Sequence, residues 1–414
     1  MRTFSTCRRK SLVILTAGAS LRMAAAAQAS PAYQGISLYP LAAPSGGTVG
    51  TIQGINNGQT FGSVQIGSNT LAAIWSGNGS LAVLQPSNLG YYSGSMVMSG
   101  APGIQGGWAV NSDNSQNHAM LWTGAANTAI DLNPTNLYAY YNSQINAVST
   151  GQQVGSGASI SHGTHAVIWA GTADSAIDVN PAGAAGSVLL GTDGINQVGY
   201  TTSNVFYTGT NPPGLLQAGL WSGTTDSYAN LTPPAASWSF RTLGAVGSSQ
   251  AVAVFGRQQV GNAVVTVQDW HNPANITFVN HAFLWTGTGS SAVDLNPADH
   301  NASWALATNG SLQVGYTVDY LADTDLTQAA VWQGTAASEL NLQQFLPAGF
   351  QSSQAYSIDA AGDIFGVGLD NFGVYHALEW TPLPEPGQFG AISVVLVALL
   401  LTRIRHASQN HRVH

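Results

Sequence analysis

Apolar residues in the middle of this chain occur in short runs, many of which alternate with polar residues. Gly, Asn, Asp and Ser bound these runs, as in residues 193–199, Asp-Gly-Ile-Asn-Gln-Val-Gly, and in residues 308–315. Runs of this kind are typical of β-strands joined by tight turns. No window outside the two termini keeps the 3.6-residue apolar period that an amphipathic helix requires. The pattern therefore predicts an all-β fold.

Seven Trp residues recur inside the same short phrase, at steps of 47, 47, 52, 64, 47 and 48 residues. In the clearest copies, at residues 118–134, 165–181 and 281–297, His-Ala-x-x-Trp-x-Gly is followed by Ala-Ile/Val-Asp-Leu/Val-Asn-Pro. The seven residues are Trp75, Trp122, Trp169, Trp221, Trp285, Trp332 and Trp380. A period in the forties indicates a repeat architecture, and one copy holds the three or four strands of a propeller blade. The sequence thus predicts a seven-bladed β-propeller over residues 30–382, with the Trp side chains on the apolar faces between blades.

The last copy stops after Trp380 and lacks its Asp-Leu-Asn-Pro strand, whereas residues 35–40, Gly-Ile-Ser-Leu-Tyr-Pro, resemble that strand. We therefore predict that the N-terminal strand completes the seventh blade and closes the ring, because closure protects the edges that an open sheet exposes. The two long steps are interpreted as loop insertions, one of which includes residues 270–279. A β-solenoid or an irregular β-sandwich array is the alternative architecture.

The composition fits a turn-rich β protein and restricts its partners. Charged residues make up 7% of the chain, and 48 residues are Gly. Residues 30–386 contain all 18 acidic side chains but only two basic ones, Arg241 and Arg257, which gives a formal charge of −16. Nucleic-acid binding is excluded because it requires a basic patch. The only Cys, Cys7, lies in the segment that we expect to be removed, so thiol catalysis and thiolate metal sites are excluded as well.

Residues 1–29 have the features of a secretory signal peptide. A positive region is followed by an apolar stretch over residues 11–27, and Ala-Gln-Ala at residues 27–29 is a small-residue cleavage pattern. The positive residues are Arg2, Arg8, Arg9 and Lys10. We expect the chain to be exported through the inner membrane; an ordinary N-terminal helix is the alternative.

Residues 383–414 combine a helix-breaking linker, an apolar segment and a basic end. The apolar segment covers residues 389–401, and Arg403 and Arg405 follow it, which favours a cytoplasmic location for that end. A helix of about 14 residues rises about 21 Å, less than the roughly 30 Å of a bilayer core. We therefore expect a C-terminal transmembrane helix that anchors the chain at least transiently.

Pro384, Glu385 and Pro386, followed by this apolar segment and by Arg403 and Arg405, resemble the PEP-CTERM sorting signal of Gram-negative bacteria. The resemblance covers only the C-terminal tail. It implies that export machinery and an exosortase-type membrane protease are partners, and that the protein is delivered to the cell surface or beyond. The repeat phrase, which reads His-Ala-Phe-Leu-Trp at residues 281–285, resembles the HAF repeat of predicted extracellular bacterial proteins. That family implies an extracellular repeat protein and no particular reaction.

Four copies of the repeat carry a His four residues before the Trp, and three carry an Asp in the phrase after it. They are His118, His165, His281 and His376, and Asp131, Asp178 and Asp294. A metal site would require three or four ligands at about 2.1 Å from one ion, but equivalent residues on different blades are dispersed. Paired carboxylates could catalyse glycoside hydrolysis, yet an Asp copied into several blades favours a turn role, because Asp bonds its own backbone. We interpret both sets as structural, with each His hydrogen-bonded inside its own blade.

Two further groups of residues are candidates for binding. An acidic loop could hold calcium, which requires six or more oxygen ligands, and a solvated loop is the alternative. Its residues are Asp319, Asp323 and Asp325, with Asp113 as a weaker candidate elsewhere. Four Trp residues outside the repeat phrase could contact a ligand or pack inside blades; they are Trp108, Trp238, Trp270 and Trp304.

The sequence contains no Gly-x-Ser-x-Gly nucleophile elbow, no His-Glu-x-x-His zinc motif, no P-loop and no dinucleotide-binding fingerprint. We therefore assign no catalytic, cofactor-binding or metal-binding residue. The leading hypothesis is an exported, non-enzymatic propeller that binds or organises polysaccharide or protein at the cell surface or in the extracellular matrix. The alternative is a glycan-active hydrolase or lyase that uses carboxylates grouped on one face of the ring.

Overall fold

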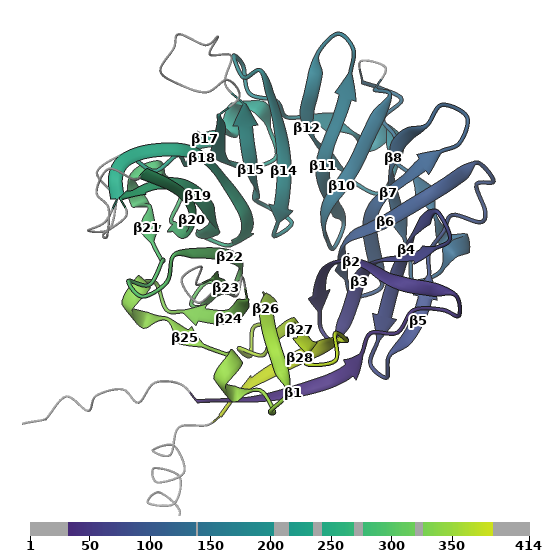
Figure 1. The fold of residues 1–414 in the computed structure, drawn as a ribbon. Helices are drawn as coiled ribbons and strands as arrows, with labels where there is room; N and C mark the ends of the chain where they lie inside the picture. The colour runs from purple at the N-terminus through teal and green to yellow at the C-terminus, as the bar shows by residue number, and fades with distance from the viewer. Residues whose placement is uncertain are drawn as a thin grey trace, which may run out of the picture. The chain divides into compact units, whose positions relative to one another are not determined.

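The computed structural model describes residues 32–137, 140–202, 215–234, 242–268, 276–318 and 326–383. These residues form seven antiparallel four-stranded sheets, which Figure 1 shows as the blades of a ring. The predicted seven-bladed β-propeller is confirmed, and the solenoid and sandwich alternatives are wrong. The expected signal peptide and the C-terminal sorting tail, with Pro384, Glu385, Pro386, Arg403 and Arg405, lie outside the described residues.

The first four blades follow the chain without interruption, and each is given from its inner to its outer strand. Blade 1 comprises β2 (Gly47–Asn56), β3 (Gln59–Ile66), β4 (Asn69–Ser76) and β5 (Ser80–Val83). Blade 2 comprises β6 (Tyr92–Ala101), β7 (Ile104–Asn111), β8 (Gln116–Trp122) and β9 (Ile130–Asp131). Blade 3 comprises β10 (Asn142–Ser149), β11 (Gln152–Ser159), β12 (Gly163–Trp169) and β13 (Ile177–Asp178). Blade 4 comprises β14 (Gly186–Thr192), β15 (Gln197–Thr202), β16 (Leu216–Trp221) and β17 (Ala229–Asn230).

The remaining blades differ in strand length and in their connection to the N-terminus. Blade 5 comprises β18 (Thr242–Phe255), β19 (Gln258–Gln268), β20 (Ile276–Trp285) and β21 (Val293–Asp294). Blade 6 comprises β22 (Ala302–Thr308), β23 (Gln313–Val318), β24 (Thr327–Trp332) and β25 (Leu340–Asn341). Blade 7 comprises β26 (Phe350–Ile358), β27 (Ile364–Asp370), β28 (Tyr375–Pro382) and, from the start of the chain, β1 (Tyr33–Pro40).

Short 3-10 helices lead from the third strand to the outer strand in blades 2 to 6. They are η1 (Ala126–Thr128), η2 (Ala173–Ser175), η3 (Thr225–Ser227), η4 (Gly289–Ser291) and η6 (Ala336–Ser338). In the last four, a Thr at the N-cap and a Ser three residues later form a capping box, which satisfies backbone donors at the start of the turn. A further turn, η7 (Gln343–Phe345), precedes blade 7.

The N-terminal strand closes the ring, as the sequence predicted. β1 pairs antiparallel with β28, and Gly35 stands opposite Trp380. The Tyr39 hydroxyl donates to the carbonyl oxygen of Gly58 in blade 1, at 2.7 Å. The strand therefore completes blade 7 and also contacts blade 1 across the point of closure.

The Gly of the Gln-Val-Gly phrase is required by the inner strand. Each inner strand is irregular opposite this Gly, and the backbone there approaches the second strand closely. A Cβ atom on Gly199 would lie 1.9 Å from the Val188 carbonyl oxygen, and one on Gly315 would lie 1.9 Å from that of Trp304. No other residue type fits without moving the strand.

The long step between Trp221 and Trp285 is only partly a loop insertion. β18, β19 and β20 contain 14, 11 and 10 residues and are longer than the corresponding strands of blade 6. Residues 276–279, which we expected in a loop, belong to β20, where Ile276 pairs with Gln268 of β19. The added residues thus lengthen the hairpin by continuing its backbone pairing, which corrects the expectation of a loop over residues 276–279.

Candidate functional site

The seven repeat Trp residues occupy the third strands of the seven blades and are fully buried. Each packs in one of seven hydrophobic clusters, and each cluster joins residues of two adjacent blades. In one such cluster, Trp380 of blade 7 packs with Val331 and Leu342 on the blade 6 side. The core of the propeller therefore lies between blades, and the repeated Trp is its largest constituent.

Four of these indoles also hydrogen-bond the preceding blade. Trp169 Nε1 donates to the Leu132 carbonyl oxygen, which follows the outer strand of blade 2, at 2.9 Å. Trp75, Trp221 and Trp380 make the equivalent bonds, to the carbonyl oxygens of Ala42, Val179 and Leu342. Within the described residues, Nε1 of Trp122, of Trp285 and of Trp332 is buried and has no hydrogen-bond partner.

A buried Ser on the inner strand links six of the seven blade junctions. Its Oγ accepts a hydrogen bond from a backbone N–H on the third strand of the preceding blade, as in Ala119 N to Ser143 Oγ at 2.9 Å. The six residues are Ser95, Ser143, Ser187, Ser249, Ser303 and Ser353. At the seventh junction, between blades 7 and 1, Val49 takes the pairing position of these Ser residues, because it lies opposite Val64, two residues after the Gly of the second strand. An additional irregularity of β2, between Val49 and Ile52, follows it and includes Gly50. The point of closure therefore lacks this link.

The Gln of the Gln-Val-Gly phrase joins two parts of its own blade. In blade 3, Gln153 Oε1 accepts a hydrogen bond from the backbone N–H of Gly171, just after Trp169, at 2.7 Å. The same bond recurs at Gln105, Gln197, Gln259 and Gln313. The two phrases of the repeat are thus partners in a single recurring contact.

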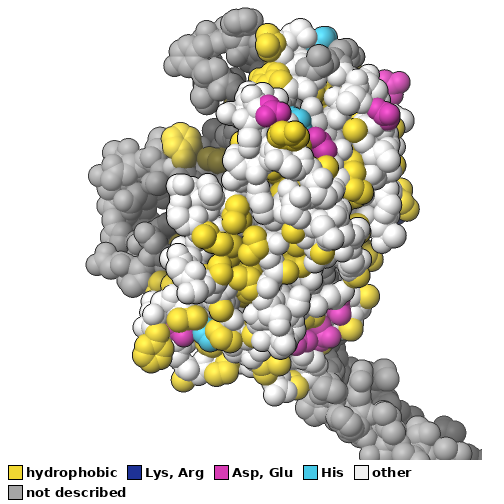
Figure 2. Space-filling view, turned by 90° about the vertical axis from the view of Figure 1, so that its right-hand side faces the viewer, with side chains coloured by type: hydrophobic (Ala, Val, Ile, Leu, Met, Phe, Trp, Pro, Cys, Tyr) yellow, Lys and Arg dark blue, Asp and Glu magenta, His cyan; other side chains and the backbone are white. Residues whose placement is uncertain are grey.

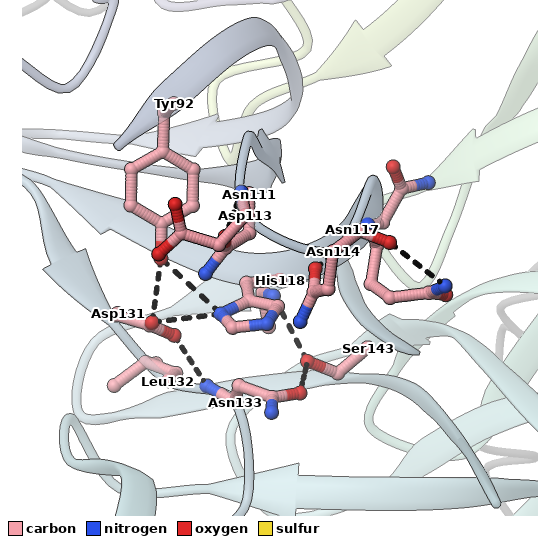
Figure 3. A network of polar contacts seen from close by, with 12 residues as sticks. Tyr92, Asn111, Asp113, Asn114, Asn117, His118, Asp131, Leu132, Asn133 and Ser143 are labelled. Carbon is pink, nitrogen blue, oxygen red and sulfur yellow. Dashed lines mark hydrogen bonds and ion pairs between the residues drawn. The ribbon is translucent and has the colours of Figure 1, made fainter. Parts of the chain in front are cut away.

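The His and Asp residues of the repeat meet inside their own blades (Figure 3). His118 Nδ1 lies 2.8 Å from Asp131 Oδ2, and the Tyr92 hydroxyl donates to the same oxygen at 2.6 Å. Asp131 Oδ1 accepts from the backbone N–H of Asn133, at 2.8 Å. Because a carboxylate only accepts hydrogen bonds, the His118 imidazole donates to it from Nδ1, in either protonation state. The Asp131 carboxylate is therefore hydrogen-bonded to the third strand, to the inner strand and to the turn after the outer strand.

Blades 3 and 5 repeat this pairing. His165 Nδ1 lies 2.7 Å from Asp178 Oδ2, and His281 Nδ1 lies 2.9 Å from Asp294 Oδ2. In both blades the second carboxylate oxygen accepts from the backbone N–H two residues later. The turn role expected of these Asp residues is observed, and the partner of each His is the Asp of the repeat phrase.

His376 in blade 7 has different partners because β1 carries Ser37 where blades 2, 3 and 5 carry Asp. His376 Nε2 lies 3.1 Å from Asp370 Oδ2, at the turn before β28. The Ser37 hydroxyl lies 3.0 Å from His376 Nδ1. The ring is therefore held from both sides even though its blade is assembled from the two ends of the propeller.

The Asp131 network predicts an acid-dependent loss of stability. Burial raises the pKa of the Asp131 carboxyl, but hydrogen bonds from His118, Tyr92 and the Asn133 backbone and the charge of His118 outweigh it, so the net shift is downward. A depressed folded-state pKa contributes stability above the unfolded-state value of about 3.9, and this stability is lost as the pH falls through the folded-state pKa. We expect Asp131→Asn to lower the free energy of unfolding by about 1 kcal/mol at pH 7.

Urea unfolding of Asp131→Asn and of the unchanged protein at pH 7 and at pH 3 measures this difference, which is expected to shrink at the lower pH. Asp226→Asn is the matched control, because Asp226 is an exposed residue of η3 in blade 4. Equal effects of Asp131→Asn at both pH values would contradict an ionised Asp131.

Of the four Trp residues outside the repeat phrase, the structure describes two. Trp108 on β7 and Trp304 on β22 are half-buried, and Trp304 stacks on Tyr316 of β23 with ring centroids 4.9 Å apart. Trp238 and Trp270 lie outside the described residues. The packing alternative therefore applies to Trp304, which has a stacking partner inside its own blade.

The acidic candidates have separate outcomes. Asp319, Asp323 and Asp325 lie outside the described residues, and Asp113 belongs to the exposed β7–β8 turn, where its backbone N–H donates to Asn111 Oδ1. Among the described residues, no three His, Asp, Glu or Cys side chains come together as a metal site would require. The same part of the chain contains no helix of sufficient length and apolar character to cross a bilayer.

A cavity of about 280 Å³ opens at the junction of blades 7 and 1. Its walls come from the inner strands β2 and β26, from β27, from the start of β28, and from Thr327 of blade 6. Gly50, in the irregular part of β2 between Val49 and Ile52, is among its lining residues. Sequence reasoning did not indicate this site, whose lining residues come from blades 1, 6 and 7.

The molecular surface is largely uncharged. Figure 2 shows, on the face that is at the right in Figure 1, mainly uncharged polar atoms and hydrophobic side chains, with a few Asp and Glu side chains near its edges. Arg257 is the only Lys or Arg among the described residues. A cleft lined by the described residues therefore offers a ligand little positive charge.

No protein-family model matches this chain, and none of the curated proteins compared with it does. Solved structures match weakly. A prolyl endopeptidase is 12% identical to this chain with a TM-score of 0.43, and the match covers 78% of this chain and 46% of the endopeptidase. A post-proline cleaving enzyme from Rickettsia typhi is 10% identical with a TM-score of 0.43, and the match covers 80% of this chain and 52% of the enzyme. The WD40 domain of coronin from Toxoplasma gondii is 8% identical with a TM-score of 0.43, covering 86% of each chain. This chain thus spans about half the length of the two peptidases, and likenesses at this level carry nothing about activity.

Proposed function

We propose that this chain is an exported, non-catalytic β-propeller that acts as a binding or structural scaffold at the cell surface or in the extracellular matrix. The observation that carries the proposal is the position of the repeated His and Asp side chains. In blades 2, 3 and 5 the Asp carboxylate bonds both the His and a backbone N–H of its own blade. These groups serve the architecture, and a scaffold needs no chemistry from them.

The delivery of the protein is proposed from the two ends of the sequence. The signal-like residues 1–29 support export, and Pro384, Glu385 and Pro386 with the apolar segment and Arg403 and Arg405 support sorting by an exosortase-type membrane protease. The apolar segment would hold the chain in the membrane at least transiently. Polysaccharide or matrix protein is the proposed binding partner outside the cell.

Intact-mass measurement of the protein from its native host tests this delivery. We expect a mass below the 42.8 kDa of the full chain by the signal peptide and by residues that follow Pro386. Mass above the doubly shortened chain that no retained terminal residues account for reports a covalent attachment. Recovery of the uncleaved chain from the cytoplasm would contradict export.

A glycan-active enzyme is the second candidate, and one carboxyl favours it. Burial and the nearby charge of Asp299 raise the pKa of Glu339 to about 7, and Glu339 Oε1 is buried without a hydrogen-bond partner among the described residues. A carboxyl that is protonated near neutral pH can act as a general acid beside a second, ionised carboxylate. If the protein releases products from polysaccharide and Glu339→Gln abolishes this release, the protein is an enzyme and the scaffold proposal is wrong.

A further inference from the structure

The cavity between blades 7 and 1 arises where the repeat is interrupted. Six junctions carry the Ser link, whereas the seventh carries none, and the cavity lies at this junction between β2 and β26. A Cβ on Gly50, in the irregular part of β2, would lie 2.5 Å from Ser63 Oγ and 3.1 Å from the Ser63 carbonyl oxygen of the same blade. The cavity is therefore a consequence of the backbone arrangement at the closure point, and its shape is fixed by strands on three sides.

One wall of the cavity is a chain of oriented polar groups. Gln354 Nε2 donates to Thr327 Oγ1 at 3.3 Å, and the Tyr356 hydroxyl donates to Gln354 Oε1 at 2.7 Å. These bonds hold the amide of Gln354 in one orientation. Each partner keeps further capacity, since an amide has two N–H donors and a carbonyl oxygen accepts twice. A ligand with hydroxyl groups can therefore bond to a preorganised wall at little cost in side-chain entropy.

The other surfaces are apolar or aromatic. Val367 and Leu369 of β27 and Ile52 of β2 line the cavity, and Tyr375, which is 42% exposed, lines it as well. Aromatic rings offer a flat apolar face with a polar edge, which suits ligands that present C–H groups and hydroxyls together. Part of the Tyr375 side chain is thus accessible to solvent beside the cavity.

Among the residues that the structure describes, no charged residue and no His lines the cavity. An anionic ligand such as a phosphate would find no Arg or Lys, which normally supply the strong bonds to such groups. A divalent cation would find no carboxylate among the lining residues. The volume lies just under the roughly 300–1,000 Å³ of small-molecule pockets. A ligand of about one ring therefore fits, and it must be neutral and rich in hydroxyl groups.

From these walls we infer that the cavity binds a single neutral sugar ring of an extracellular polysaccharide, with the amide of Gln354 bonding its hydroxyls and Tyr375 covering its apolar face. This inference rests on the proposed function, because it assigns a ligand class to a scaffold that binds polysaccharide. The rest of the polysaccharide would continue outside the cavity. Binding would also bridge blades 7 and 1 at the junction that lacks the Ser link.

Isothermal titration of the propeller with four neutral tetrasaccharides tests the inference: cellotetraose, maltotetraose, mannotetraose and chitotetraose. Tetragalacturonate is the charged comparison. We expect binding of at least one neutral probe, no binding of the charged one, and a loss of affinity of about tenfold or more in Gln354→Leu and in Tyr375→Ala. Gln144→Leu is the matched control, because Gln144 occupies the same inner-strand position in blade 3, away from the cavity.

Thermal melting of every variant identifies unfolded ones, and Tyr375→Phe, which keeps the ring, is expected to bind more tightly than Tyr375→Ala. Binding of neutral probes that Gln354→Leu and Tyr375→Ala leave unchanged would overturn the cavity as the site, while the scaffold function would stand. Absence of binding of all four neutral probes would also overturn it. Hydrolysis of a bound probe would instead overturn the non-catalytic function, and a dependence on Gln354 in that case would still support the cavity.

Discussion

Deletion of residues 30–42 is expected to leave the propeller insoluble or partly unfolded. The deletion removes β1, and with it all the backbone pairing on the outer side of β28. Tyr33 is buried in the cluster shared with blade 6, and Tyr39 and Leu41 are buried in the cluster shared with blade 1. Burial of one such side chain contributes about 1.5–3 kcal/mol, so the loss approaches the roughly 5–15 kcal/mol by which a domain is stable.

The lost hydrogen bonds act at the same place. Trp75 Nε1 loses its acceptor, the Ala42 carbonyl oxygen, while the edge of β28 becomes open to pairing with other chains. The soluble fraction after expression and the thermal melting curve measure the effect. Removal of residues 1–31 is the control truncation, because it spares β1.

Moving the strand tests whether the effect belongs to β1 itself. Residues 30–42 can be joined after Leu383 through a linker with the sequence of residues 123–129, which makes the corresponding connection in blade 2. Because β1 pairs with β28 antiparallel, as β9 pairs with β8, this permuted chain is expected to fold. A soluble deletion variant as stable as the intact propeller would show that ring closure does not require the N-terminal strand.

Replacement of a repeat Trp by Ala is expected to be the most damaging single substitution. Trp169 is fully buried among residues of blades 2 and 3, and large-to-small changes of this kind cost about 3–5 kcal/mol. Urea unfolding of Trp169→Ala measures the loss. An effect below about 1 kcal/mol would show that the blade junctions do not depend on this side chain.

A pair of Phe variants separates packing from hydrogen bonding. Trp169→Phe removes an N–H that donates to the Leu132 carbonyl oxygen, whereas Trp122→Phe removes a buried N–H without a partner. Both variants lose similar volume, but only the first leaves a buried acceptor unsatisfied. We expect Trp169→Phe to be less stable than Trp122→Phe by about 1–3 kcal/mol. Equal losses, measured by urea unfolding, would mean that the inter-blade bond contributes nothing.

Much of the fold could be predicted because the repeat copies its local requirements seven times. The Trp phrase, the Gln-Val-Gly phrase and the lookalike strand at residues 35–40 indicated the number of blades and the closing strand before any coordinates. The structural role of Asp131 also followed from its repetition, since it caps the turn at Asn133. The pairing of Asp131 with His118 did not, because the two residues are 13 apart and meet only when β9 lies beside β8.

The candidate site was hidden for a different reason. Gly50 reads as one of 48 glycines, and only its place at the closing junction, next to β26, makes it part of a cavity. Gln354 and Thr327 belong to different blades, so no spacing in the sequence relates them. The extension of β20 by residues 276–279 could likewise not be predicted from the sequence, because a mixture of polar and apolar residues near a turn fits a loop and a hairpin equally well.

The sequence by itself determined the strands, their grouping into seven copies and the charge of the surface, because turn residues, apolar runs and side-chain composition act locally. The tertiary structure decided which blade supplies the acceptor for each indole, how His376 is held beside Ser37, and where a cavity forms. The indole bonds depend on the packing of each blade against the preceding one, whereas the contacts of His376 and the cavity require residue 33 to lie beside residue 382, which the closing of the ring accomplishes.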